Sequence, residues 1–400
     1  MIELVESVAT EVKEKWELDP DIYMADIATD LDRLSESVHG KIADLVSKSG
    51  ELRKLLLEKE GIIDASEVVE TAPLKNVAII DGAKITHSDR SSSYIITCSS
   101  CISQEKDVWK QSSCCARVPH STCLESTATG LMMMQEVMMA VEVAEEDPGV
   151  FVFIDGSRIS SLIHIHSFYS NLKKELGNRL DIWRNEAIQQ GANAMEPART
   201  FAKFESRDWV TPYLMNPRIV GNLKLVTTTG IVEEYLPEFL SVFDDKTVAN
   251  ALLMAGERTA RLPVFNHEKT GKQKPQAILS DSEYPFREEV AKTFEKIVKS
   301  EGDESMSYVY YRPFGYHSAY KIEFSNLLLS QQGRFEKLLR WWYDETDSVT
   351  SFEEPYRFFL VDLQAKKFVT LGKDILTETF MRRLAEGDEN LAIGMSYRSQ

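Results

Sequence analysis

The sequence predicts an α/β fold in which a mixed sheet is flanked by helices. Short runs of Val, Ile and Phe alternate along the chain with longer segments of helical periodicity, so that strands repeatedly precede helices. The runs are apolar throughout, as in central strands that are buried on both faces. With 43% apolar and 10% aromatic residues, the composition is that of a globular protein.

Residues 1–70 are predicted to form an N-terminal helical region, and residues 71–400 a single α/β domain. In the N-terminal region, apolar side chains recur at steps of three and four residues: Leu31, Leu34, Val38, Ile42 and Leu45. Such a helix either packs on the core or serves as an arm that contacts a second copy or a partner. The sequence leaves both readings open.

Two of the predicted strands end in Asp-Gly. The run 75–80 is followed by Asp81 and the run 149–154 by Asp155. Asp-Gly is also an ordinary turn signal, and a single occurrence would favour a turn. Because the layout occurs twice, and functional groups gather beyond strand ends in open α/β sheets, we expect Asp81 and Asp155 on adjacent strands of one site.

A predicted helix over 127–146 lies between these strands and carries Glu136 and Glu142. A third apolar run, 356–361, is predicted as a strand that ends at Asp362. Further strands are expected at 91–97, 218–226, 308–312 and 319–324, and further helices at 170–190, 246–255 and 374–386.

Clustered carboxylates indicate a divalent metal site. Mg²⁺ and Mn²⁺ prefer oxygen ligands, and several acids at one sheet edge repel one another unless a cation is bound. Pairs of such ions activate water and stabilise the leaving oxygen in phosphoryl chemistry. Asp81, Glu136, Asp155 and Asp362 are the candidate catalytic and metal-binding residues, with Glu142 an alternative to Glu136.

The net charge of −17 counts against a surface that coats nucleic acid. Any DNA contact must be confined to a local groove or depend on a partner that delivers the strand. The first residues lack the pattern of a signal peptide, and no apolar stretch is long enough for a membrane helix, so we expect a cytoplasmic protein without membrane contact.

Other site classes are weakly supported. Lys272 lacks the glycine and hydroxyl residues of a phosphate-binding loop, and neither a dinucleotide fingerprint nor a nucleophile elbow is present. A cysteine cluster consists of Cys98, Cys101, Cys114, Cys115 and Cys123. Cys98 and Cys101 have the spacing of half a zinc site, and His120 could complete one, but the chain has no second pair with this spacing, which favours reduced thiols. His164 and His166 would share one face of a strand, and the Met-rich stretch from Leu131 indicates helix packing.

The segments around both aspartates resemble the Asp-Gly-Ser motifs of the NurA nuclease family. The first is Val-Ala-Ile-Ile-Asp-Gly-Ala (77–83) and the second Val-Phe-Ile-Asp-Gly-Ser (152–157). Later segments resemble family motifs in the same order over about residues 70–375: Arg-Ile-Val-Gly-Asn-Leu-Lys (218–224), Ala-Gly-Glu-Arg-Thr (255–259), Lys-Ile-Glu-Phe (321–324) and the run from Pro355 to Asp362.

This resemblance implies a ribonuclease H-like core, a homodimer, Mn²⁺- or Mg²⁺-dependent DNA cleavage and a HerA-type ATPase/translocase partner, in DNA end processing, repair or antiviral defence. Asp81, Glu136 and Asp155 would ligate the metal, and Lys224 and Arg258 are candidate phosphate contacts. Ala83 replaces the usual Ser, and Asp362 stands where the family usually has His. These two departures keep open a catalytically degenerate subunit with a structural role.

Overall fold

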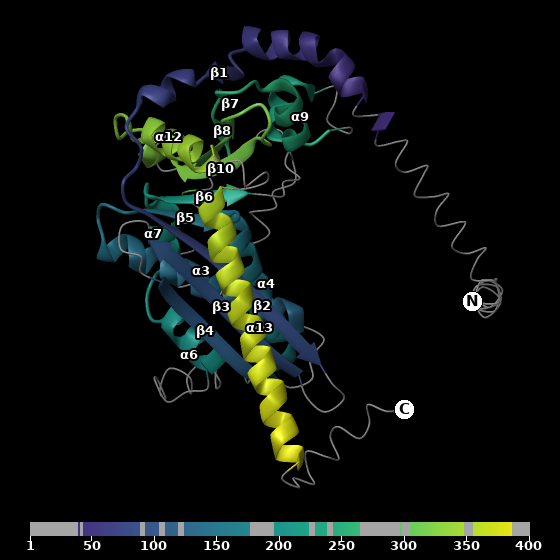
Figure 1. The fold of residues 1–400 in the computed structure, drawn as a ribbon, viewed down its shortest axis with the longest axis vertical. Helices are drawn as coiled ribbons and strands as arrows, with labels where there is room; N and C mark the ends of the chain where they lie inside the picture. The colour runs from purple at the N-terminus through teal and green to yellow at the C-terminus, as the bar shows by residue number, and fades with distance from the viewer. Residues whose placement is uncertain are drawn as a thin grey trace, which may run out of the picture.

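A computed structural model places one mixed sheet at the centre of the chain (Figure 1). It describes residues 39–40, 43–88, 93–103, 109–118, 124–176, 196–223, 229–237, 243–264, 297, 305–347 and 355–385. The sheet has ten strands in the order β1-β7-β9-β10-β6-β5-β2-β3-β4, with β8 paired to β9.

The strands are β1 (Ile62–Asp64), β2 (Val77–Ser88), β3 (Ser93–Ser103), β4 (Trp109–Val118), β5 (Phe151–Asp155), β6 (Ile219–Leu223), β7 (Glu257–Thr259), β8 (Leu262–Pro263), β9 (Met306–Arg312) and β10 (Tyr320–Ser325). The helices are η1 (Ser66–Glu70), α3 (Leu124–Glu146), α4 (Arg158–Leu176), α6 (Glu196–Glu205), α7 (Val210–Met215), α8 (Gly230–Tyr235), α9 (Asp245–Leu252), η4 (Asn326–Leu328), α12 (Arg334–Thr346) and α13 (Tyr356–Ala385).

The middle of the sheet is parallel and its sides are antiparallel. β5 pairs in parallel with β2 and with β6. β3 and β4 extend the sheet beyond β2, and β10 and β9 extend it beyond β6, all by antiparallel pairing. The long helix α13 runs across β2 and β3 on one face, while α3 packs behind the same strands, with α4 against α3 and α6 against α3 and β4 (Figure 1).

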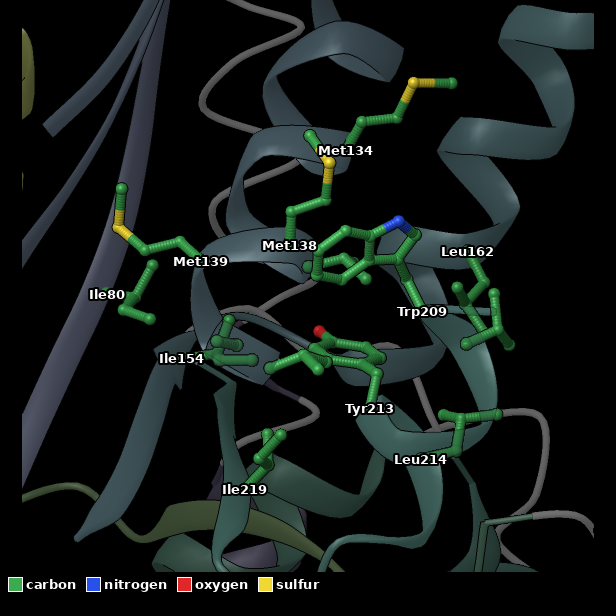
Figure 2. Packing of buried hydrophobic residues seen from close by; sticks show 14 of the residues in the cluster. Ile80, Met134, Met138, Met139, Ile154, Leu162, Trp209, Tyr213, Leu214 and Ile219 are labelled. Carbon is green, nitrogen blue, oxygen red and sulfur yellow. The ribbon is translucent and has the colours of Figure 1, made fainter. Parts of the chain in front are cut away.

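Alternation along the central strands sends their side chains into two separate cores. Ile80 and Ile154 enter a cluster with α3, α4 and α7, in which Met134, Met138 and Met139 are buried (Figure 2). These methionines therefore pack the helix against the sheet, as their spacing predicted.

Ile79 and Phe153 enter the second core, on the face covered by α12 and α13. The Phe153 ring stacks on Trp341 at 4.4 Å between centroids and meets Trp342 edge-on at 4.8 Å. Both tryptophans are buried, so this pair belongs to the core.

The prediction of a strand over 356–361 is wrong, because these residues form the first turns of α13. The buried positions Phe358, Val361, Ala365 and Val369 are spaced by three and four residues, which is the periodicity of a helix face. A window of six apolar residues is too short to reveal this period.

Other elements differ from expectation in extent. Asp81 lies inside β2, which continues through Ser88, whereas a strand end was predicted there. β4 was not predicted, since its Ser- and Cys-rich sequence lacks an apolar run. His164 and His166 lie in α4, where residues two apart point in different directions, so the paired face expected of a strand does not form.

The N-terminal region is described from residue 39, and the predicted arm over residues 1–38 lies outside the described residues. Residues 43–58 are helical, and Leu45, Leu52 and Leu56 pack with side chains of α8 and α9. Arg53 forms a bidentate ion pair with Glu257, and β1 pairs with β7 at the sheet edge. This segment is thus packed against the sheet. In the parts of the chain described, no helix combines the length and apolarity needed to cross a membrane.

Candidate metal centre

Asp81 and Asp155 occupy neighbouring positions on adjacent parallel strands. Ile80 of β2 is the register partner of Ile154 of β5, so the two aspartates follow at the same level. Ile79 and Phe153 belong to the core beneath α13, and alternation places Asp81 and Asp155 on that same face. The predicted adjacency of the two strands is confirmed.

Glu136 approaches the same level from the α3 face. A Cβ added to Gly82 would lie 2.2 Å from Glu136 Oε1, so the absence of a side chain at Gly82 makes room for this carboxylate. The Gly82 N–H donates to Asp81 Oδ1 at 2.8 Å and is also hydrogen-bonded to Glu136. One amide is therefore shared by two of the predicted ligands.

Burial and the nearby Asp155 raise the pKa of Glu136 to about 8, although the Gly82 N–H opposes this rise. Glu136 is 2% exposed and its neighbour Asp81 8% exposed. These acids are held close together and away from water, which is costly unless a proton or a cation compensates their charge.

The early end of β5 allows acids on opposite faces of the sheet to interact. It ends at Asp155, whereas β2 continues for several residues beyond that level. The edge of β2 past Asp155 is therefore not covered by β5. Asp155 and Glu136 interact electrostatically although they reach the sheet from opposite layers.

The turn after Asp155 is fixed by a buried carboxylate on β10. Gly156 has a φ of 148°, a conformation that favours glycine. Ser157 Oγ donates to Glu323 Oε2 at 2.9 Å, and the Arg158 N–H donates to the same oxygen at 3.1 Å. Glu323 thereby accepts hydrogen bonds from the first turn of α4 and fixes the position of the chain that follows Asp155.

Asp362 is placed on α13 and not at a strand end. It lies between Val361, in the core that contains Ile79, and Ala365, which packs in a cluster with Ala83. Since Asp81 lies between Ile79 and Ala83, Asp362 stands on the helix at about the level of Asp81. Its carboxylate accepts a hydrogen bond from Lys366 Nζ at 2.8 Å.

Asn222 was not predicted as a site residue, although it lies in the segment 218–224 considered above. It is the register partner of Asp155 on β6 and is 1% exposed. The sequence signal was weak, because one Asn in an apolar strand does not by itself indicate a ligand. Glu323 was missed for the same reason.

The remaining candidates lie elsewhere. Glu142 projects from another side of α3 and pairs with Lys203, which favours Glu136 as the acid of this helix. Arg258 donates to the Thr259 carbonyl oxygen and lies over the Phe335 ring, so its contacts in the structure are packing contacts. Lys224 lies outside the described residues.

The cysteine cluster does not converge where it is described. Cys98 packs beneath α13 and Cys101 packs with α3, because residues three apart on a strand point to opposite faces. Burial raises the pKa of Cys101 to about 12. Cys114 and Cys115 belong to β4, and nothing of their side chains is described; His120 and Cys123 lie outside the described residues.

The chemistry of the donor set fits a hard divalent cation, since Asp81, Glu136 and Asp155 offer only oxygen atoms. Among the described residues, no three His, Cys, Asp or Glu side chains already enclose a single point.

Comparison with known proteins decides the fold. No protein-family description matches the sequence, and no curated protein matches it. The structure of the NurA nuclease from Sulfolobus solfataricus superposes with a TM-score of 0.51 and 11% identity, over 90% of this chain and 98% of that chain. A structure of NurA with manganese gives a TM-score of 0.51 and 10% identity, over 88% and 98% of the two chains.

The chain has the fold of the NurA nucleases. The predicted fold class, a mixed sheet flanked by helices, is confirmed by this match and by the observed topology. At 10–11% identity the likeness concerns the fold and not the activity.

Proposed function

We propose that this protein is a metal-dependent DNA nuclease that hydrolyses phosphodiester bonds. The observation that carries the proposal is the placement of three acids at one level of a NurA-like sheet. Asp81 and Asp155 share a level on adjacent strands, and Glu136 reaches it through the space left by Gly82. A structure of NurA, which has the same fold, has been solved with manganese, and this supports Mn²⁺ or Mg²⁺ as the cofactor.

Asp81, Glu136 and Asp155 would hold the cation, with Asp362 a further acid at the same level. A bound divalent ion supplies water activation and stabilises the leaving oxygen. The chain's own contribution is positioning: Gly82 admits Glu136, its N–H orients Asp81, and Glu323 fixes the turn that follows Asp155. Glu136, whose charged form is disfavoured by burial, also offers a site for a proton when the cation is absent.

The strongly acidic chain implies that DNA is delivered and not captured by a basic exterior. We propose a HerA-type hexameric translocase as the delivering partner and a homodimer as the working unit, in the cytoplasm, in DNA end processing, repair or antiviral defence. Lys224 and Arg258 remain the candidate phosphate contacts. The N-terminal region is proposed to contribute to a protomer or partner contact. Deleting residues 1–38 leaves the packed helix over 43–58 in place, and it should weaken assembly more than it lowers stability.

The central test is Asp155→Asn, which keeps the side-chain volume but removes a charge that a cation needs. Cleavage of labelled DNA with Mn²⁺ or Mg²⁺, with and without a translocase partner, should fall by orders of magnitude. Asp44→Asn is the matched control, because Asp44 is exposed and pairs only with nearby Lys48 in the described structure. Wild-type rates in Asp155→Asn would exclude Asp155 as a catalytic ligand.

A catalytically degenerate subunit is the second candidate. It is favoured by Ala83, which packs with Ala365 and Val369 where the family usually has Ser, and by Asp362, which stands where the family usually has His. If the wild type neither cleaves DNA nor responds to Mn²⁺ in thermal melting, a structural role in a complex becomes the better account.

A further inference from the structure

Asn222 carries a buried amide without a hydrogen-bond partner. Neither its Oδ1 nor its Nδ2 is paired with any of the described residues, and the residue is 1% exposed. A buried amide in this state destabilises the fold, and nearly all such groups in folded proteins are paired. Its presence in a central strand therefore requires an explanation.

The position of Asn222 relates it to the candidate metal centre. On β6 it is the register partner of Asp155, and it also forms an isolated bridge with Gly156. Val220, two residues earlier, packs in the same core as Phe153. Alternation then places Asn222 and Asp155 on the same face, so that Asp81, Asp155 and Asn222 form a row across three adjacent strands.

Packing alone does not call for an amide here. On its other side Asn222 is the register partner of Ile322, which is fully buried in the apolar core beneath α12 and α13. A Val or Leu at position 222 would match these neighbours and would leave no polar atom unsatisfied. A cation bound beside Asp155 would give the amide oxygen a partner that none of the described residues supplies.

We infer that Asn222 is a binding residue of the metal centre, with its Oδ1 as an oxygen ligand of the divalent cation beside Asp155. Amide carbonyl oxygens are ordinary ligands of hard cations. Being neutral, Asn222 adds a donor to a site already crowded with carboxylates without adding repulsion. This inference rests on the proposed function, since it assumes the same cation.

The test measures the binding of Mn²⁺ alone, by calorimetry and by the metal-induced rise in melting temperature. Asn222→Leu should bind Mn²⁺ at least about tenfold more weakly and lose most of that rise. Its metal-free melting temperature should stay the same or increase, because an unsatisfied amide is removed. Asn222→Asp keeps an oxygen in place, so it should bind Mn²⁺ at least as tightly as the wild type.

Asn326→Leu is the matched control. Asn326 is also a buried amide, but it follows β10 at the level where β6 begins, the opposite end from Asn222. It should leave Mn²⁺ binding unchanged.

The outcomes separate this inference from the proposed function. If the wild type binds Mn²⁺, Asp155→Asn does not, and Asn222→Leu binds like the wild type, the role of Asn222 alone is overturned. It is equally overturned if Asn222→Asp folds but loses binding. If the wild type fails to bind Mn²⁺, both the metal centre and the role of Asn222 are overturned.

Discussion

At the scale of single residues, Gly82 has the most specific requirement in the candidate centre. The Asp-Gly pair could be read from the sequence either as a turn or as a site, but Gly82 lies inside a continuous strand. What the position requires is space. The missing side chain leaves room for Glu136 Oε1 and for Met132 Cγ, which would lie 2.2 Å and 2.7 Å from an added Cβ.

Gly82→Ala should therefore displace Glu136 and impair metal binding. We expect DNA cleavage to fall at least about tenfold and stability to drop by about 1–3 kcal/mol, the usual cost of overpacking. Activity assays and denaturant unfolding measure the two effects. Gly315→Ala is the control, because an added Cβ there has nothing within 4 Å. Equal behaviour of both variants would show that the space beside Gly82 is unimportant.

Glu136 gives a pH prediction for the metal-free protein. Its pKa of about 8 lies above the ordinary value of 4.5, chiefly because of burial. The folded state therefore binds the proton more tightly than the unfolded state, and stability is lost as pH rises from about 4.5 through 8. Glu136→Gln cannot ionise, so with EDTA present it should exceed wild-type stability at pH 9 by a few kcal/mol, roughly.

This advantage should shrink as the pH falls toward 5, where Glu136 is protonated in the folded protein. Urea unfolding at several pH values is the measurement. A constant difference between the two proteins across that range would mean that Glu136 does not titrate as proposed.

The acids themselves were identifiable from sequence, whereas their surroundings were not. Asp81 and Asp155 follow apolar runs, and this pattern is visible in the sequence without any knowledge of the fold. Asn222 and Glu323 become meaningful only when β6 is placed next to β5 and β10 next to β6. That pairing joins residues more than sixty positions apart, which local periodicity does not record.

At the scale of elements, the start of α4 is the best-defined support of the centre. Glu323 accepts hydrogen bonds from the Ser157 hydroxyl and the Arg158 N–H. The Arg158 guanidinium in turn donates to the carbonyl oxygens of Tyr213 and Leu214, at the end of α7. Two helices and β10 thus converge on the residues that follow Asp155.

Removing the carboxylate should cost more than removing the hydroxyl. Glu323→Ala leaves the buried Arg158 and Lys321 with less compensating charge, and about 3–5 kcal/mol of stability should be lost. Ser157→Ala removes one capping hydroxyl, which typically contributes about 1 kcal/mol. Paired denaturant unfolding tests the ranking, and equal losses would contradict a central role for Glu323.

Helix α13 shows where element prediction failed. Its first residues, 356–361, are apolar enough for a strand, yet the run continues as a helix of 30 residues. Burial at Phe358, Val361, Ala365 and Val369 follows the helical period only over several turns. In contrast, the runs before Asp81 and Asp155 do form strands, although β2 continues beyond Asp81.

At the scale of the whole molecule, one sheet separates two apolar cores. Phe153 lies at the centre of the core beneath α12 and α13, fully buried and within 4.4–6.2 Å of the rings of Trp341, Trp342 and Phe358. It is also two residues before Asp155 on the same strand, so packing and site geometry depend on the same ring.

Phe153→Ala should lower the free energy of unfolding by about 3–5 kcal/mol. Phe359→Ala provides the comparison, because Phe359 is 45% exposed on α13 and its truncation should change stability by less than about 0.5 kcal/mol. Thermal or chemical unfolding of both variants is the measurement. Similar effects of the two would mean that the stacked rings contribute little.

The early end of β5 has a consequence for how the molecule unfolds. At Asp155, two acids of the central strands and one acid of α3 lie near one another although they come from opposite faces of the sheet. A cation held there would link α3 to β2 and β5. Without it, α3 is free to separate from the sheet by local fluctuation. With it, that separation requires release of the ion, so α3 and the central strands of the loaded protein would unfold together.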